Sequence, residues 1–385
     1  MGQEYRPDRR GHEPTSRVIR VSPVTTASHH QSRSPLSRNF QDLVPFGAKD
    51  LEYLNLAFSL GDSDPRWSFG PGGENGLRLQ RALETMANAW GLPPATLTLH
   101  ADRYLAFYLA INGVVEANSF PSVSLSLIDK KEILAIVDGL PASLTRHHYR
   151  CGIDGIFDVS GDAESLHIFQ LRNGETGISQ KRLPEGPVII DATSALPGDL
   201  NRFDLTSRPW NAIVCDATSW GGPRGLYLLA VNPAFHWRNP LPTLDTAMPT
   251  FGANFGLTML AALKLEEFLK FDHQSIDLMN ERVREIVSSL ADVDIAGSDT
   301  RDRLSISFLY TESEELQRRL FVEGFLFDSG SACSSSQLEP SHVLTRMGLL
   351  SQGNVRIRFR PENLGSAEEF AHTLVAKVGE ERART

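Results

Sequence analysis

The sequence predicts an α/β fold, in which a large domain with a mostly parallel sheet flanked by helices is followed by a smaller α+β C-terminal domain. Three short apolar runs, each bounded by Gly, Pro, Asp or Asn, predict buried strands of the sheet: residues 187–190, 212–214 and 226–231. Two segments with helical periodicity and two that alternate polar and apolar residues follow them: 257–270, 275–290, 304–309 and 355–359. We expect the two alternating segments to be half-solvated strands, and strand-rich α/β sequence before α+β sequence indicates two domains.

The chain of 385 residues divides into three parts. Residues 1–38 are rich in Arg, Ser, Thr, Pro and His, so we expect a disordered tail that cannot bury enough apolar surface to offset its chain entropy. We expect the large α/β domain over residues 39–245 and the α+β domain over residues 246–385. Apolar residues at helical spacing predict a helix near the start of the large domain, ending before Gly91: Leu79, Ala82, Leu83, Met86 and Trp90.

Composition excludes several classes of function. With 22% charged residues and a net charge of −9, the chain gives no reason to propose nucleic acid as its main partner, because phosphate binding needs a basic face. We find neither an apolar run of the roughly 20 residues that span a bilayer nor a signal-peptide pattern, so we expect no membrane association. The three cysteines, Cys151, Cys215 and Cys333, have no CxxC spacing, which argues against a disulfide framework or a metal site and favours the cytoplasm.

Cys333 lies in the most distinctive stretch of the sequence, SGSACSSSQLEPSHVL over residues 329–344. The cysteine is surrounded by small polar residues and precedes a helix expected to begin near Pro340. A helix N-terminus and nearby donors favour the thiolate, so a reactive thiol is one interpretation. An incidental surface thiol is the other.

This stretch, with MGL at 347–349 and GNVRIRF at 353–359, resembles the catalytic-cysteine loop and the following helix and strand of the cysteine desulfurases. That family belongs to the class V aminotransferase superfamily, within fold type I of the pyridoxal phosphate enzymes. The resemblance implies that Cys333 carries sulfur as a persulfide and passes it to a partner protein. It also implies pyridoxal phosphate as cofactor and a homodimer.

Two further stretches resemble cofactor-binding segments of that family. Asp191 follows an apolar run and resembles the aspartate that pairs with the pyridinium nitrogen, although a strand-end Asp is also often a turn former. Asn173 begins NGETG, which resembles the family's Asn-Asn-Glu-Thr-Gly turn, with Gly174 in place of the second Asn.

The segment CDATSWGGPRGLY over residues 215–227 departs from the family pattern. There, a Ser-Gly-His-Lys stretch precedes a Gly-Pro-Lys/Arg-Gly turn, and its lysine forms the Schiff base. Counting back from that turn puts Ser219 at the lysine and Thr218 at the histidine. A hydroxyl cannot form an imine, and the nearest lysines in sequence are Lys181 and Lys264. We therefore expect pyridoxal phosphate to bind weakly or not at all.

The other expected cofactor and substrate positions also differ. Residues 99–105, LHADRYL, fall where the family has a Ser-Gly-Ala-Thr-Glu phosphate loop, and lack its small residues. Lys130 falls at the ring-stacking histidine. The substrate-carboxylate arginine corresponds to Asn363, with Arg360 near enough to replace it.

Three functions follow, in this order of preference. The first is a sulfur-handling protein in which Cys333 accepts a persulfide and transfers it to a sulfur-acceptor protein. The second is a non-catalytic scaffold that binds an active desulfurase or an iron–sulfur assembly protein. The third is an unorthodox pyridoxal phosphate enzyme that recruits a lysine from elsewhere.

Overall fold

The structure is a computed structural model, and it describes most of the chain: residues 36–59, 70–159, 163–203, 205, 210–242, 254–298, 300–330 and 340–384. Most of the predicted tail and the whole segment 331–339, which contains Cys333, lie outside these residues. No helix in the described part is long and apolar enough to cross a membrane.

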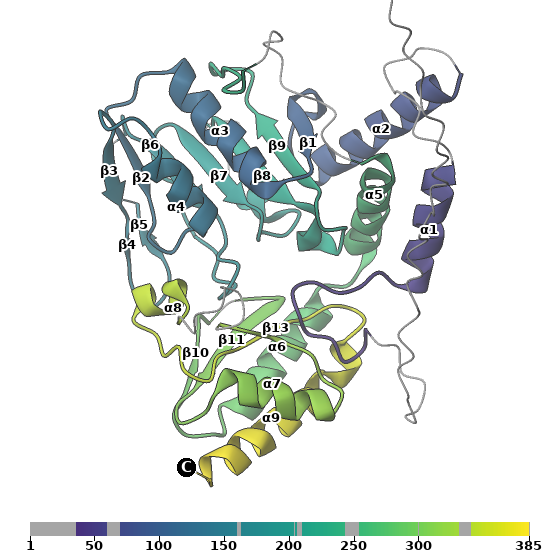
Figure 1. The fold of residues 1–385 in the computed structure, drawn as a ribbon, viewed down its shortest axis with the longest axis vertical. Coiled ribbons are helices and arrows are strands. Elements are labelled where there is room, and N and C mark those ends of the chain that lie inside the picture. Colours follow the sequence, from purple (N-terminus) through teal and green to yellow (C-terminus); the bar gives the residue numbers. More distant parts are fainter. Residues whose placement is uncertain are drawn as a thin grey trace, which may run out of the picture. The chain divides into compact units, whose positions relative to one another are not determined.

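A seven-stranded sheet forms the centre of the large domain (Figure 1). Its strands lie in the order β1 (Leu97–His100), β9 (Tyr227–Val231), β8 (Ala212–Asp216), β7 (Val188–Ala192), β6 (Leu166–Gln170), β2 (Ser122–Leu125) and β3 (Thr145–His148). The five strands from β8 to β3 are mutually parallel, whereas β9 runs antiparallel to both of its neighbours. The predicted mostly parallel sheet is confirmed.

Both faces of this sheet are buried, which explains why its strands are nearly continuous apolar runs. Successive residues of a strand point to opposite faces. In β7, accordingly, Ile189 packs into the core beneath the helices α3 (Arg103–Ala117) and α4 (Lys131–Asp138). Ile190 packs on the other face, in the core that contains Trp90.

Three more helices complete the large domain: α1 (Ala48–Ser59), α2 (Gly70–Ala89) and α5 (Phe255–Lys270). The expected helix ends as predicted, because Gly91 takes a positive φ of 65° after α2. Met259 and Leu265 of α5 belong to the large-domain core, so the packing of that core extends beyond residue 245.

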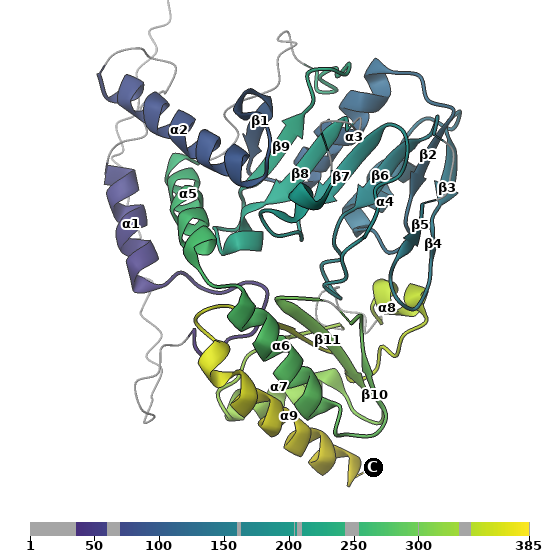
Figure 2. The same cartoon turned by 180° about the vertical axis from the view of Figure 1, so that it is seen from behind.

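The C-terminal domain is a four-stranded sheet covered by helices (Figure 2). Its strands lie in the order β10 (Val293–Ile295), β11 (Arg303–Phe308), β13 (Val355–Arg358) and β12 (Asp328–Ser329), all antiparallel. Its helices are α6 (Gln274–Val287), α7 (Ser313–Val322) and α9 (Ala367–Arg382), while the short α8 (His342–Met347) packs on the large domain through Val343 and Met347. The strands β4 (Arg150–Cys151) and β5 (Phe157–Asp158) form a separate two-stranded antiparallel sheet.

The expectation that β11 is half-solvated is wrong, because all six of its residues are buried. Its polar residues have partners within the protein. Asn354 Nδ2 donates to Ser305 Oγ and Ser307 Oγ, both at 3.0 Å, and Arg303 reaches the carbonyl of Gly174 at 2.7 Å. The alternating pattern therefore marks a polar internal face rather than a solvent-facing one.

The segment before α1 packs on the C-terminal domain. Phe40 is fully buried in that core, with its ring centroid 4.7 Å from that of Phe370. Its backbone N–H donates to Leu326 O at 2.8 Å, and its carbonyl accepts from Arg358 N at 2.8 Å. The chain thus begins its described part in one domain before entering the other.

Candidate functional site

The polar cluster at the C-terminal end of β7 centres on an ion pair between Asp191 and Lys130. Asp191 is 1% exposed, and its Oδ2 lies 2.7 Å from Lys130 Nζ. Its Oδ1 accepts from Thr193 N at 2.9 Å and Thr193 Oγ1 at 2.6 Å. Lys130 also donates to Ser194 Oγ at 3.3 Å. Both carboxylate oxygens of Asp191 are therefore engaged by side chains and backbone of the chain itself.

Two neighbours of this pair are also buried. Burial raises the pKa of Asp129 to about 8, against a lowering backbone hydrogen bond from Ser126, and nearby Asp191 raises it further. Asn173 Oδ1 accepts from Glu175 N at 2.9 Å and Thr176 N at 3.0 Å, while its Nδ2 donates to Gln170 Oε1 at 2.9 Å. The amide of Asn173 therefore organises its own turn.

Ser219 lies in the turn after β8, where it is 1% exposed, and no partner for its Oγ is found among the described residues. The turn begins with Asp216, whose Oδ1 accepts from Thr218 N at 2.9 Å. Arg358 of β13 then holds the turn from the other domain, because its guanidinium donates to Thr218 O at 3.0 Å and Ser219 O at 2.6 Å. The side chains of Asp216 and Arg358 thus fix the turn through its backbone.

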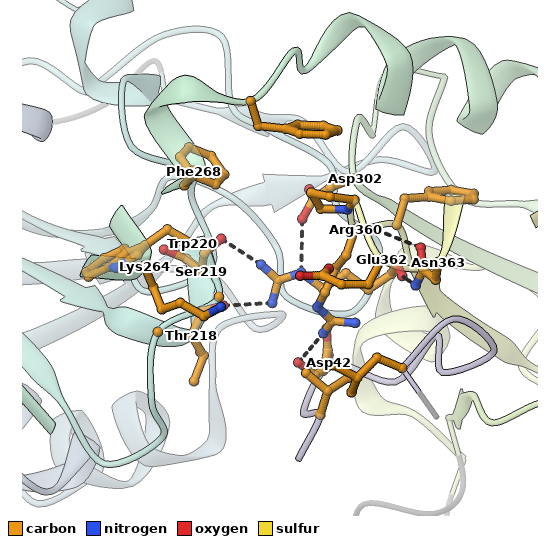
Figure 3. Close-up of a pocket in the computed structure, with 18 of the residues that line it drawn as sticks. Asp42, Thr218, Ser219, Trp220, Lys264, Phe268, Asp302, Arg360, Glu362 and Asn363 are labelled. Atoms are coloured by element: carbon orange, nitrogen blue, oxygen red, sulfur yellow. Dashed lines mark hydrogen bonds and ion pairs between the residues drawn. The ribbon is translucent and has the colours of Figure 1, made fainter. Parts of the chain in front are cut away.

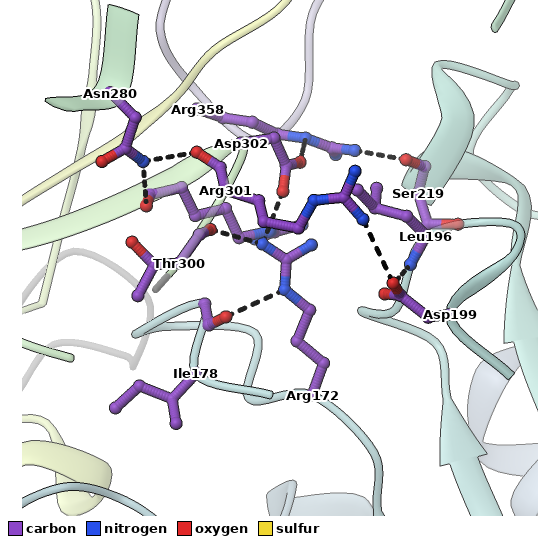
Figure 4. Close-up of polar contacts among 12 residues, drawn as sticks. Arg172, Ile178, Leu196, Asp199, Ser219, Asn280, Thr300, Arg301, Asp302 and Arg358 are labelled. Carbon is purple, nitrogen blue, oxygen red and sulfur yellow. Dashed lines mark hydrogen bonds and ion pairs between the residues drawn. The ribbon is translucent and has the colours of Figure 1, made fainter. Parts of the chain in front are cut away.

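A buried arginine–carboxylate network continues from that turn (Figure 4). Asp302 lies 2.6 Å from Arg172 Nη2 and 3.1 Å from Arg358 Nε. Burial opposes ionisation of Asp302, but Arg172 and Arg358 outweigh it and hold the pKa of this carboxyl well below its usual range. Arg172 also donates to Thr300 O at 2.6 Å, so the network joins the two domains.

A cavity of about 640 Å³ adjoins this network and includes Ser219, Lys264 and Arg360 in its wall (Figure 3). Arg360 is 9% exposed and donates to Asp42 O at 2.5 Å, whereas no partner for its Nη1 is found in the described part of the chain. Burial lowers the pKa of Arg360 to about 9, and the positive charge of Arg358 lowers it further. Arg360 is therefore a cation in an environment with an excess of positive charge.

Asn363 and Lys264, also in the cavity wall, are both committed to internal contacts. Asn363 Oδ1 accepts from Arg360 N at 2.8 Å, and its Nδ2 donates to Asn39 O at 2.8 Å. Lys264 Nζ lies 3.0 Å from Asp50 Oδ1 and 3.1 Å from Glu267 Oε2. Burial alone would lower the pKa of Lys264, but its hydrogen bonds to both carboxylates raise it, which disfavours the free amine.

At residues 99–105, where a phosphate loop would fall, the polar side chains are engaged in contacts within the protein. Asp102 caps α3, because its Oδ1 accepts from Leu105 N at 2.8 Å. Arg103 pairs with Glu132, with its Nε at 3.1 Å from Glu132 Oε1. His100 is buried, which lowers its pKa to about 4.

Cys333 itself lies outside the described residues, but both ends of its segment are anchored. Arg356 Nη2 donates to Ser329 O at 2.6 Å before it. After it, Ser341 Oγ accepts from Leu344 N at 3.3 Å and donates to Glu175 Oε2 at 2.6 Å. Of the other cysteines, Cys215 is buried with its pKa raised well above the usual value, and burial raises the pKa of Cys151 to about 11. Neither resembles an activated thiol.

The structure thus brings Asp191, Asn173 and the Ser219 turn to the same edge of the sheet, and Arg360 and Asn363 to the cavity beside it. These residues do not fit pyridoxal phosphate, because Ser219 is no amine and Asp191 is already paired. The ion pair of Lys130 was missed by sequence reasoning, which considered only lysines near Ser219 in the chain. The available signal was a lysine, Lys130, at the ring-stacking position, because its charge is opposite to that of Asp191.

Comparison with known proteins gives the family. No family model matches the chain. Cysteine desulfurases of Rattus norvegicus and Mus musculus are 32% and 33% identical to it over 344 and 343 residues, which is 79% and 78% of this chain and 73% and 71% of theirs. The match to the cysteine desulfurase IscS of Dictyoglomus turgidum is shorter, with 28% identity over 35% of this chain and only 37% of that protein.

Solved structures share the fold. A NifS-like protein superimposes with a TM-score of 0.75 at 17% identity, covering 89% of this chain and 99% of that one. A cysteine desulfurase from Thermococcus onnurineus NA1 gives 0.75 at 14% identity, covering 90% and 95%. The fold class predicted from the sequence is confirmed, and the chain belongs to the cysteine desulfurase family.

Proposed function

We propose that this chain handles sulfur through Cys333, as a persulfide carrier that needs no pyridoxal phosphate of its own. Family membership and the intact SGSAC stretch at residues 329–333 support the proposal. The Cys333 thiolate would attack the outer sulfur of a donor persulfide, R–S–SH. A new S–S bond forms, the old one breaks and R–S⁻ leaves to take up a proton. One sulfur atom moves from the donor thiol to Cys333, without net oxidation or reduction.

The anchoring of the segment supports a role beside the cleft. Its C-terminal end is tied to Glu175 through Ser341, and His342 Nε2 lies 3.1 Å from Asp129 O. Both contacts reach the polar cluster that contains Asp191. The small polar residues around Cys333 in the sequence would leave room for a donor or an acceptor thiol to approach it.

We propose that Arg360 binds an anionic group of the donor, such as a carboxylate. Its Nη1 is uncommitted within the described residues, and the neighbouring arginines leave a positive potential that an anion would neutralise. Asn363 would act through Arg360, because it accepts from the backbone of that residue and ties it to Asn39. Asn363 is therefore proposed as a positioning residue.

Labelling with a ³⁵S-persulfide donor tests the carrier role. We expect the wild-type chain to take up label that a thiol reductant releases, and Cys333→Ser to lose it. Cys151→Ser is the matched control, because that thiol is partly exposed but has a raised pKa. Label that survives in Cys333→Ser and disappears in Cys151→Ser would refute the assignment.

A scaffold function is the second candidate, and the exposed apolar residues of α1 favour it. Leu51 and Phe58 are 49% and 53% exposed and lie two helical turns apart on one face of α1, and adjoining exposed apolar side chains are typical of a binding surface. The surface could bind a second copy of this chain, in the homodimer implied by family resemblance, or an active desulfurase. Sedimentation of wild-type protein and Leu51→Glu, alone and with a desulfurase, tests this. Identical behaviour of the two proteins would reject it.

The third hypothesis, an unorthodox pyridoxal phosphate enzyme, would require a lysine to leave its ion pair. Lys130 contacts Asp191 and Lys264 lines the cavity, and carboxylates hold both. We rank this function last for that reason.

A further inference from the structure

The pairing of Lys130 with Asp191 has a chemical meaning beyond the loss of the Schiff-base lysine. In a protein that binds a pyridine cofactor, a carboxylate at this strand end pairs with the protonated ring nitrogen. Here the Lys130 ammonium lies at 2.7 Å from the same carboxylate, and its side chain is only 15% exposed. The position that a ring nitrogen would take is filled by an atom of the chain, with the same charge.

The remaining contacts make this pair complete. Thr193 saturates the second oxygen of Asp191, and Ser194 accepts from Lys130. Burial raises the pKa of the adjacent Asp129 carboxyl to about 8, which disfavours a second negative charge beside Asp191. Lys130 and Asp191 are therefore satisfied by each other and by Thr193 and Ser194, and neither needs a ligand.

The N-terminus of α3, where a phosphate loop would fall, is also engaged by side chains of the chain itself. The backbone N–H groups at a helix N-terminus attract phosphate, but the Asp102 carboxylate already accepts from the first turn of α3. The neighbouring Arg103, the residue best able to attract an anion there, is paired with Glu132. An incoming phosphate would have to compete with two carboxylates.

We propose that Lys130 is an intramolecular substitute for the cofactor's charged ring nitrogen, and that it excludes pyridine-ring cofactors from the cleft whatever residue stands at position 219. The exclusion is a property of the Asp191–Lys130 pair, and it does not depend on whether Cys333 carries sulfur. Restoring a lysine at position 219 alone is then insufficient to restore cofactor binding.

Three full-length variants test the substitution: Ser219→Lys, Ser219→Lys with Lys130→His, and Ser219→Lys with Lys131→His. The last is a matched control, since Lys131 is the exposed neighbour at the start of α4. Each is titrated with pyridoxal phosphate, reduced with borohydride and mapped by mass spectrometry. We expect the Lys130→His combination to bind tighter than the other two by about tenfold or more, with the adduct on residue 219.

A second measurement does not require the aldehyde or the introduced lysine. Pyridoxine 5′-phosphate cannot form an imine, so any shift in melting temperature reports the ring site alone. We expect it to stabilise Lys130→Gln and to leave wild-type protein unchanged. Equal binding by Ser219→Lys with and without Lys130→His would overturn the proposal. Folded Lys130→Gln and Lys130→His proteins that bind neither phosphate ester would also overturn it. A pyridoxal phosphate adduct on Lys130 of the wild type would do the same.

Discussion

Replacing Asp302 with Asn should destabilise the protein severely, because this carboxylate pairs with two buried arginines. Its oxygens lie 2.6 Å from Arg172 Nη2 and 3.1 Å from Arg358 Nε. Arg172 is 0% and Arg358 4% exposed, and each forms its only ion pair within the described residues with Asp302. The substitution keeps the shape of the side chain but removes the negative charge that both buried guanidinium groups contact.

Removing one partner of a buried ion pair costs about 3–5 kcal/mol. The two pairs share one carboxylate, so their contributions are coupled and do not simply add. Against a typical unfolding free energy of about 5–15 kcal/mol, the loss is large. Urea unfolding monitored by circular dichroism measures it. Glu185→Gln is the control, because its pair with Arg182 is exposed (69% and 64%) and should have little effect.

The pH dependence gives an independent check. The arginines hold the pKa of Asp302 well below its usual range, against the effect of burial. Its stabilising contribution is therefore present above the unfolded pKa of about 3.9 and is lost as the pH falls below that value. Wild-type protein should lose stability on acidification below about pH 4 more steeply than Asp302→Asn. A variant within about 0.5 kcal/mol of wild type at pH 7 would refute the account of this network.

Three further predictions concern single residues. Phe40→Ala should lower the unfolding free energy by about 3–5 kcal/mol, because the ring is fully buried in the C-terminal core, and urea unfolding measures this. Burial lowers the pKa of His100 to about 4, so stability should fall by about 3 kcal/mol as the pH drops from 6.5 to 4, and His100→Gln should flatten that slope. Asp102→Ala should cost about 1 kcal/mol through loss of the α3 cap, and a melting temperature unchanged in this variant would contradict the assignment.

The sequence predicted the sheet because its strands are buried on both faces. Local apolar runs therefore carry the signal, and Asp191 at the end of one run was found in the same way. The reversal of β9 against β8 was not predicted, because direction depends on pairing partners and not on composition. The polar internal face of β11 was missed for a related reason. A strand that alternates polar and apolar residues has one polar face, but the pattern does not show whether water or other polar side chains cover that face.

The polar network of the site was beyond reach of local patterns. Arg172 and Asp302 are 130 positions apart, and nothing in either neighbourhood marks the pair. Lys130 was identified at the ring-stacking position, but its ion pair depends on where the start of α4 lies relative to the end of β7. The opposite charges of Lys130 and Asp191, at two positions that would both face a cofactor ring, would have indicated the ion pair.

Binding of pyridoxal phosphate by the unaltered full-length chain is the most direct measurement of whether the cleft is closed. The visible spectrum is recorded with added cofactor, before and after free cysteine, and borohydride-reduced protein is mapped by mass spectrometry. We expect no cofactor band, no spectral change with cysteine and no stoichiometric adduct. A yellow protein with one equivalent of cofactor fixed to Lys130 or Lys264 would contradict the assignment of that lysine to a structural ion pair.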